Sequence, residues 1–329
     1  MRMAERAQRE PRMRGPRMRD GMPLVAIAAA AWGLDGVLRK PLATQLDAAT
    51  VVLWEHLIVV LAVSAAIPSA ARAFLRCTRS EQIAIALIGI GASALATALF
   101  TEAFAAAATS GDFVSPLVLQ KLQPLFAVTL AVVLLGERVR PAFAAYAAPA
   151  LIGAWLLAFP RPFDVTVAQV KVAVLATAAA ALWAAGTVLG RRVSIAVSPG
   201  ELTVLRYCWG LPAAFVITLQ QHASMQPGAG NLLGLLLLAL IPGLAALRLY
   251  YVGLRSTAAS RATFAELAFP ATAALIGVLF LGTRLSPSQW IGLLVVVAAV
   301  SALSARERRP HPLVAAAVEP SEPVALAVN

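Results

Sequence analysis

Long apolar segments dominate the chain, and short polar stretches separate them. A helix needs about 20 mostly apolar residues to cross the hydrocarbon core of a membrane. Ten segments meet that length, near 23–41, 50–71, 82–106, 113–135, 142–160, 168–190, 201–220, 232–253, 262–282 and 287–305. They are continuously apolar, without the alternation that the strands of a membrane barrel show. The pattern therefore predicts an all-α integral membrane protein with ten transmembrane helices.

Basic residues are concentrated in every second connection between these segments. With the N-terminus placed inside, 19 of the 27 Lys and Arg residues lie in the inner connections and tails, and 5 in the outer ones. This asymmetry is the positive-inside signal of membrane proteins. We therefore expect a multi-pass protein of the inner (plasma) membrane with both termini in the cytoplasm. The net charge of +11 needs no nucleic-acid partner to explain it.

Composition excludes several other classes of protein. Of the 329 residues, 60% are hydrophobic and only 13% are charged, whereas soluble domains carry about 25% charged residues. Cys77 and Cys208 make no disulfide framework, and the three histidines are too dispersed in sequence for a metal site. No cofactor is predicted. Residues 1–22 are expected to be a basic cytoplasmic tail, or an over-extended start before Met22, and 306–329 a disordered cytoplasmic tail.

The two halves of the chain, 23–160 and 168–305, share sequence matches in register. Trp32, Val37 and Leu38 recur 151 positions later as Trp183, Val188 and Leu189. A second set recurs 146 positions later: Pro124, Leu135, Gly136, Arg138 and Pro141 match Pro270, Leu281, Gly282, Arg284 and Pro287. Each half holds five segments, so the second half would enter the membrane from the opposite side. The sequence thus predicts two inverted five-helix repeats, a plan shared by many secondary transporters.

Helix-end signals agree with these boundaries. Gly136 and Gly282 suit the position just after a helix, where left-handed backbone is common. Pro141 and Pro287 suit the first position of the next helix. Ser286 with Gln289 reads as a capping box.

Several of these motifs resemble a known family. The Trp32-Gly33 pair resembles the EamA-type branch of the drug/metabolite transporter superfamily. So do the stretch from Leu122-Gln123-Pro124 to Leu135-Gly136-Glu137 and its repeat from Glu266-Leu267 to Leu281-Gly282. The resemblance covers about residues 24–305 and implies a ten-helix exporter or importer of small molecules. The second half departs from the family pattern at Thr283, where a Glu would be expected.

Charged side chains inside the segments mark candidate sites, because a charge at a helix centre costs about 2.5–3.5 kcal/mol on insertion scales. These residues are Asp35, Glu55, Glu102, Lys121, Arg206, Arg248 and Glu266. Glu102 has no basic neighbour on its own helix, so Lys121 is its predicted partner in coupling or substrate recognition. Asp35 either joins this site or pairs with Arg39 one turn later. Glu55 either joins Asp35, Glu102 and Lys121 in a charged group in the outer half of the membrane or is solvated near the outer surface.

Prolines point to a second feature of the candidate site. Pro124 and Pro270 would free the carbonyls of Gln120 and Glu266, four residues earlier. Matching breaks in two halves indicate a transporter site, although a proline can also merely kink a packed helix. Arg248 and Glu266 form either a structural pair or an inner gate.

Three further side chains have a functional and a plainer interpretation. Trp32 and Trp183 line the cavity or simply pack. His56 either titrates near neutral pH or is a hydrogen-bonded core residue. Arg206 lies near a cytoplasmic helix end, where its head group can reach water.

These observations predict a secondary active transporter that moves a small metabolite or drug by alternating access, with proton-coupled efflux. Its expected partners are the substrate, protons and the lipid bilayer, and it is a monomer or homodimer. No phosphate-binding loop is present. The alternatives are an intramembrane enzyme and a membrane scaffold or sensor. Matched prolines in inverted repeats favour transport over a scaffold.

Overall fold

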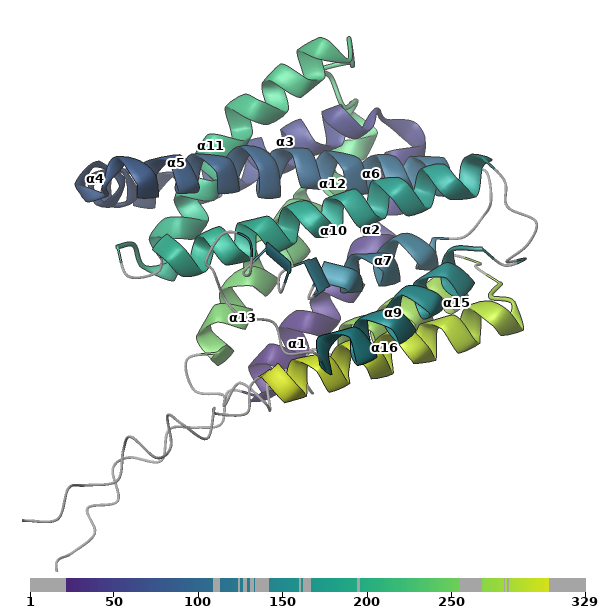
Figure 1. Ribbon diagram of the computed structural model, residues 1–329. Helices are drawn as coiled ribbons and strands as arrows, with labels where there is room; N and C mark the ends of the chain where they lie inside the picture. The colour runs from purple at the N-terminus through teal and green to yellow at the C-terminus, as the bar shows by residue number, and fades with distance from the viewer. Residues whose placement is uncertain are drawn as a thin grey trace, which may run out of the picture.

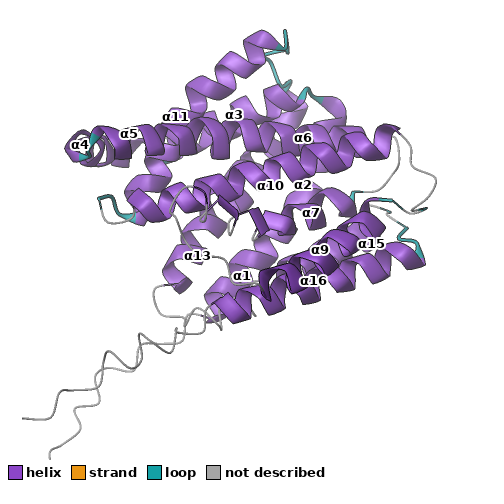
Figure 2. Cartoon of the chain, in the orientation of Figure 1, coloured by secondary structure: helices purple, strands orange, loops and turns teal. Residues whose placement is uncertain are grey.

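The computed structural model describes residues 22–108, 113–123, 125–126, 129–130, 133, 142–159, 161, 167–193, 196–254, 268–280, 282 and 284–307. Helices dominate this part of the chain, and it contains no strand (Figure 2). The prediction of an all-α protein is confirmed.

In chain order the elements are α1 (Met22–Gly33), α2 (Asp35–Gln45), α3 (Ala48–Ala62), η1 (Ser64–Ala66), α4 (Ile67–Arg76), α5 (Arg79–Leu87), η2 (Ile88–Leu95), α6 (Ala96–Ala107), α7 (Val114–Leu119), η3 (Gln120–Leu122), α9 (Ala142–Ala158), α10 (Val167–Val193), α11 (Pro199–Gln220), η4 (Ala229–Asn231), α12 (Leu232–Leu238), η5 (Ala239–Ala245), α13 (Ala246–Leu254), α15 (Ala268–Leu279) and α16 (Pro287–Glu307). The elements η1, η3 and η4 are 3₁₀ turns, and η2 and η5 are π-helices.

Several helices are long and apolar enough to cross a membrane. Within the described residues these are Arg79–Ala107, Gln169–Gly190, Pro199–Gln220 and Ala229–Tyr250. A fifth span results if Ala48–Ala62 and Ser64–Arg76 are one bent unit. Each of the ten predicted segments is mainly helical where it is described, and the exceptions are single residues at breaks or ends, such as Leu34, Val63 and Phe113. The count of ten spans stays a prediction, because the fourth and ninth segments run partly outside those residues.

The second predicted segment is not a straight helix. Its chain bends by 63° between Ala48–Ala62 and Ser64–Arg76. Beyond the bend, α4 buries Ala70 and Ala73 but exposes Leu75, and it carries Arg72 and Arg76. A short amphipathic basic helix of this kind suits the membrane surface. The prediction of a continuous span over 50–71 is therefore wrong at its inner end.

The first segment is longer than predicted. After a one-residue break at Leu34, the helix continues as α2 to Gln45. Arg39, which the charge pattern assigned to the outer connection, is 3% exposed within α2. The predicted boundary at 41 was wrong because polar side chains of α2 find partners inside the bundle.

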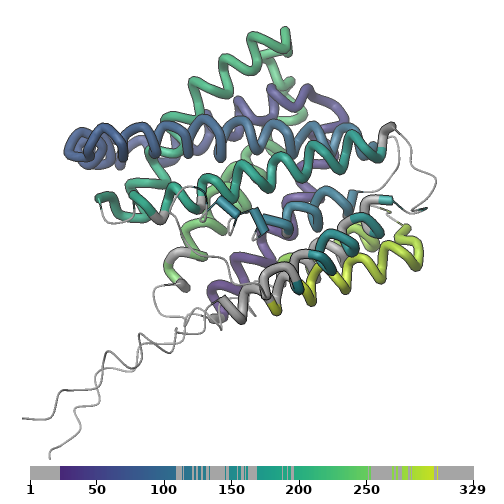
Figure 3. Tube along the Cα trace, viewed as in Figure 1, coloured from purple at the N-terminus to yellow at the C-terminus, as the bar shows by residue number. Residues whose placement is uncertain are grey.

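Helices from the first half of the chain pack against helices from the second half. The first span, α1, lies against α13 and α15, and α10 lies against α6 and α7. In the same way α11 packs on η2, and α3 packs on η5. Two further pairs, α3 with α11 and α9 with α16, lie side by side (Figure 1). The start of α1 and the end of α16 lie at the same end of the bundle (Figures 1 and 3).

The two π-helices begin at Ile88 and Ala239, which are 151 positions apart. Each interrupts a long span in its middle, between α5 and α6 and between α12 and α13. A π-helix has a wider turn than an α-helix, and such segments often occur at functional sites. In η5, Pro242 also removes one backbone N–H. Backbone carbonyls in both segments accept bonds from side chains on other helices.

Helix ends in the second half follow the predicted signals. Gly282 has φ of +67° after α15, the left-handed backbone expected of that position. The Ser286 amide donates to Gln289 Oε1 (3.0 Å), the Gln289 amide donates to Ser286 Oγ (3.3 Å), and α16 starts at Pro287. Gly136 and Pro141 lie outside the described residues.

Candidate functional site

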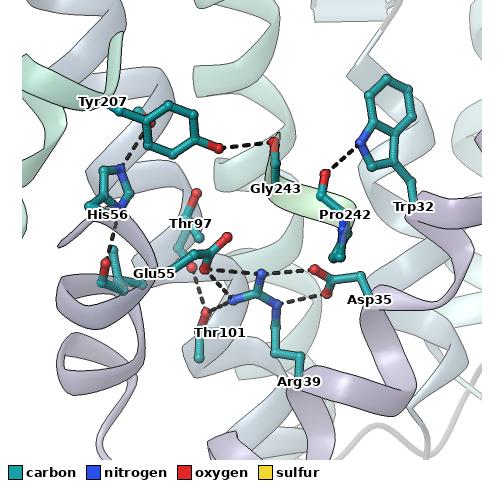
Figure 4. Close-up of polar contacts among 12 residues, drawn as sticks. Trp32, Asp35, Arg39, Glu55, His56, Thr97, Thr101, Tyr207, Pro242 and Gly243 are labelled. Carbon is teal, nitrogen blue, oxygen red and sulfur yellow. Dashed lines mark hydrogen bonds and ion pairs between the residues drawn. The ribbon is translucent and has the colours of Figure 1, made fainter. Parts of the chain in front are cut away.

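A buried arginine links three helices near the outer end of the predicted bundle. Arg39 comes from α2, and its guanidinium lies against Asp35 of the same helix, Glu55 of α3 and Thr101 of α6 (Figure 4). We call these four residues the Arg39 cluster. Arg39 is 3% exposed, Glu55 6% and Thr101 0%. The cluster is therefore an enclosed polar site within an apolar bundle.

Every N–H of Arg39 has a hydrogen-bond partner. Nε and Nη2 donate to the two oxygens of Asp35, at 2.7 and 2.8 Å. Both Nη1 and Nη2 donate to Glu55 Oε2 at 3.3 Å. Nη1 also donates to Thr101 Oγ1 at 2.6 Å, and the Thr101 hydroxyl donates to the Thr97 carbonyl. A guanidinium has five N–H groups, so this pocket is built for arginine and does not suit lysine.

The cluster carries an excess of negative charge. It combines one guanidinium with two carboxylates when both acids are ionised. The apolar rings around it supply little compensation, although the Phe100 ring lies 5.7 Å from the guanidinium carbon. An uncompensated charge in a membrane interior is costly. The site is therefore suited to accept a positive charge, such as a proton.

A second polar row lies beside the Arg39 cluster. His56, next to Glu55 on α3, contacts the Val52 carbonyl through Nδ1 and Ser93 Oγ through Nε2, each at 2.9 Å. Its ring lies 5.2 Å from that of Tyr207 on α11. The Tyr207 hydroxyl donates to the Gly243 carbonyl at 3.2 Å (Figure 4). Ser93 belongs to η2 and Gly243 to η5, so this row joins the two π-helices.

Both tryptophans singled out by the repeat lie inside the bundle. Trp32 Nε1 donates to the Pro242 carbonyl at 3.0 Å, and its ring lies 5.1 Å from that of Tyr250. The ring of Trp183 lies 5.2 Å from that of Phe100, edge on. Trp32 and Trp183 pack against one shared apolar cluster that includes Phe104, Leu117 and Phe269. Their contacts are those of packing residues, and Trp183 also lies against Phe100, the ring next to Arg39.

The structure pairs Glu102 with Lys171. The Lys171 Nζ lies 2.7 Å from Glu102 Oε1, and the two side chains are 54% and 39% exposed. Glu102 is thus near the surface of the bundle, and its partner comes from α10. The side chain of Lys121 lies outside the described residues, so the Glu102–Lys121 pair stays a prediction.

The remaining predicted residues have separate locations. Asp35 pairs with Arg39, which was one of the two alternatives predicted for it. Glu55 is buried, so the interpretation that placed it in water is wrong. Gln120 opens the 3₁₀ turn η3 and is partly buried, which agrees with a loosened turn before Pro124. Arg248 is exposed on α13, and Glu266 lies outside the described residues.

Two functional candidates escaped the sequence reasoning: Arg39 as a buried residue, and Thr101. Arg39 was counted with the outer connection because it lies at the end of the first predicted segment, two residues before its boundary at 41. The i,i+4 spacing of Asp35 and Arg39 was the available signal. Nothing in the sequence distinguishes Thr101 from other threonines. Within the described part of the chain, no group of three His, Cys, Asp or Glu side chains is placed to hold a metal ion.

Comparisons with known proteins place the chain among membrane transporters. The sequence model of the EamA-like transporter family matches residues 19–159 and 170–305. The chain is 29% identical over 296 residues to the riboflavin transporter ImpX of Fusobacterium nucleatum, covering 86% of this chain and 97% of that protein. It is 28% identical over 216 residues to the uncharacterized transporter YwfM of Bacillus subtilis, covering 63% of this chain and 69% of that protein.

The fold is similar to that of a crystal structure whose description names no function. The TM-score between the two is 0.58 and the sequence identity is 20%, and the match covers 89% of this chain and all of that one. At this identity the likeness concerns the fold alone. The family model, in contrast, matches both halves of the chain separately. Together with the long apolar helices, this match shows that the chain is a multi-pass membrane transporter and belongs to the EamA-like transporter family.

Proposed function

We propose that this protein is a secondary active transporter with two inverted repeats, and that protonation of the Arg39 cluster couples proton movement to transport of a small metabolite. The observation that carries the proposal is the enclosed Arg39 cluster, with two carboxylates and one guanidinium between α2, α3 and α6. Family membership favours transport over the intramembrane enzyme and the scaffold.

The helix contacts support the inverted repeat. A two-fold relation between halves exchanges the first and sixth spans, the third and eighth, and the second and seventh. The pair α1–α13 then corresponds to α10–α6, and the pair α3–η5 corresponds to α11–η2; all four contacts are present. The pairs α3–α11 and α9–α16 correspond to themselves and would lie on the axis. The equal spacing of the two π-helices agrees with the same relation.

Charge balance supports the proton coupling. The charged groups nearest Glu55 are Asp35 and Arg39 from α2 and Arg206 from α11. Tyr207 Oη lies with Glu55 Oε1 beside Gly243, and His56 is the next residue on α3. Arg39 balances one of the two carboxylates, whereas Arg206 bonds the Ala92 carbonyl instead of a carboxylate. The second carboxylate of the cluster then becomes neutral by taking up a proton. Binding and release of that proton would change the attraction between α2 and α3, because both carboxylates share one guanidinium. The predicted proton-coupled efflux uses this step, and uptake would use it in the opposite direction.

The substrate class is proposed from the relative and from the aromatic residues inside the bundle. The match to the riboflavin transporter ImpX covers 97% of that protein. Trp32, Tyr250, Phe100 and Trp183 bring aromatic faces to the centre of this bundle, and such faces stack on flat heteroaromatic molecules. Riboflavin is the first substrate to test.

The experiment is riboflavin flux into proteoliposomes, with and without an imposed pH gradient of either direction. We expect the gradient to accelerate wild-type flux in one direction, which identifies efflux or uptake. Glu55→Gln should transport at a rate that no longer responds to the gradient. Glu102→Gln is the matched control, because Glu102 is exposed and paired with Lys171. A gradient response that persists in Glu55→Gln and disappears in Glu102→Gln would transfer the coupling role to the originally predicted residue.

A further inference from the structure

Arg206 has an incompletely used guanidinium inside the bundle. It lies eight positions into α11, and its Nη2 donates to the Ala92 carbonyl of η2 at 2.8 Å. Its Nε is buried and has no hydrogen-bond partner among the described residues. A buried charged donor without a partner is costly, so its persistence calls for an explanation.

The polar face of α3 that holds Glu55 lies against the face of α11 that holds Arg206. The residues that follow them, His56 and Tyr207, have ring centroids 5.2 Å apart. Glu55 Oε1 and Tyr207 Oη both lie beside Gly243, at 3.7 and 3.6 Å from where its Cβ would be. Glu55 thus has Arg39 on one side and the Arg206–Tyr207 face on the other.

The repeat spacing relates these groups to each other. Glu55 and Arg206 are 151 positions apart, and so are Ala92 and Gly243. Arg206 binds the carbonyl of Ala92 in η2, and Glu55 lies beside Gly243 in η5. Equivalent positions in the two halves therefore contact equivalent positions, but one carries a carboxylate and the other a guanidinium. Opposite charges at equivalent positions allow a direct pair when the π-helical contacts open.

We propose that Arg206 is a positioning residue that takes over the Glu55 carboxylate when Arg39 releases it. This inference rests on the proposed coupling role of Glu55. In the present structure Arg39 holds Glu55, and Arg206 rests on the Ala92 carbonyl. In the opposite state of the cycle, Arg206 leaves that carbonyl and binds ionised Glu55. The substrate-free transporter can then change back to its starting conformation without an unpaired carboxylate inside the membrane.

The lengths of the Arg39 contacts favour a transfer of Glu55 from Arg39 to Arg206 over a permanent Arg39–Glu55 pair. The Arg39–Glu55 contacts are long, at 3.3 Å, whereas those to Asp35 are 2.7 and 2.8 Å. Asp35 lies on the same helix as Arg39 and moves with it, but Glu55 belongs to α3. Separation of α2 from α3 therefore breaks the Glu55 contacts first. An ionised carboxylate in that position needs a new cation, and a guanidinium with a free Nε can supply one.

The test separates riboflavin exchange from net flux in proteoliposomes. Exchange needs only the substrate-bound transitions, whereas net flux needs the return of the empty transporter. We expect Arg206→Gln to lower net flux by at least about tenfold and to leave exchange near the wild-type rate. In a Glu55→Gln background, Arg206→Gln should have no further effect, because a neutral side chain at position 55 needs no cation. Arg192→Gln is the control, since Arg192 is exposed and contacts Ser80.

A second measurement needs no substrate. The midpoints of thermal unfolding of wild type, Glu55→Gln, Arg206→Gln and the double variant form a double-mutant cycle. We expect the two substitutions to be non-additive at a pH where Glu55 is ionised, and to become additive when the pH is lowered until Glu55 takes up a proton. Arg206→Lys keeps the charge and should retain more of the net flux than Arg206→Gln. Arg206→Met, which also removes the charge, replaces Arg206→Gln in both experiments if the latter does not fold.

Equal losses of exchange and net flux in Arg206→Gln, together with additive midpoints, would overturn the role of Arg206. A different result would contradict the proposed function itself, namely proton coupling through Glu55. In that case Glu55→Gln alone would still respond to the pH gradient, a result that involves no change at Arg206.

Discussion

At the residue scale, Arg39 organises the polar interior of the first half. Its bidentate contact with Asp35 fixes the guanidinium plane, and the contacts with Glu55 and Thr101 join α2 to α3 and α6. Removing one partner of a buried ion pair leaves an uncompensated charge, which costs more than the loss of an exposed pair. The cluster is thus both a stabilising contact and the proposed coupling element.

Arg39→Gln should lower the free energy of unfolding by about 3–5 kcal/mol, because the buried carboxylate of Glu55 and the mostly enclosed carboxylate of Asp35 lose their cation. Lys171→Gln removes the exposed partner of Glu102 and should change it by only about 0–1 kcal/mol. Thermal unfolding of the detergent-purified variants measures both. Similar midpoints for the two variants would mean that the Arg39 cluster does not hold α2, α3 and α6 together.

At the element scale, the π-helices create close contacts that only small residues fit. A Cβ on Gly89 of η2 would collide with the Trp209 Cβ of α11 and come 2.9 Å from the Arg206 carbonyl oxygen. A Cβ on Gly186 of α10 would collide with the Ala92 Cβ. Small residues allow membrane helices to approach closely, because packing drives their association. The third span is therefore wedged between α10 and α11 at its π-helical turn.

Gly89→Ala should destabilise the protein by about 1–3 kcal/mol, since the added methyl group forces the α11 backbone to shift. Gly200→Ala is the matched control, because no atom lies within 4 Å of its added Cβ. The midpoint of thermal unfolding compares the two variants. If Gly89→Ala also lowers riboflavin flux while the protein stays folded, the contact between η2 and α11 takes part in the transport cycle. An unchanged midpoint would show that α11 can move away from η2 without cost.

At the scale of the whole molecule, the two halves of the chain are interleaved rather than separate. Helix α1 packs on α13 and α15 from the second half, and α10 packs on α6 and α7 from the first half. Each half thus completes the core of the other, and Trp32 and Trp183 pack in one shared cluster. Neither half is expected to fold alone.

The charge pattern predicts the sidedness of this bundle. A fluorescent protein fused after Glu307 should be bright, because it folds in the cytoplasm, and alkaline phosphatase fused there should be inactive. Alkaline phosphatase fused after Gln226, between α11 and η4, should be active, since that connection carries no Lys or Arg and is predicted to be external. The reverse pattern of activities would invert the topology while leaving the helix packing as described.

The class of this protein could be read from its sequence alone. Continuous apolar runs, the distribution of arginines and the matches between Trp32 and Trp183 and between Pro124 and Pro270 predicted a helical membrane transporter with two related halves. These properties depend on solvent and on local spacing, because the membrane interior admits only apolar, internally hydrogen-bonded segments. Helix ends such as Gly282 and Ser286 were predictable for the same local reason.

Tertiary structure decided which charges meet. Glu102 is paired with Lys171 of α10, 69 positions away, a partner that the sequence did not indicate, and Glu55 is buried on Arg39 rather than solvated. The contacts of Arg206 with Ala92 and of Trp32 with Pro242 depend on π-helical turns that no sequence periodicity announces. Spacing along one helix determines only i,i+4 neighbours, such as Asp35 and Arg39. Partners on other helices are fixed by how the helices cross, and that depends on the packing of the whole bundle.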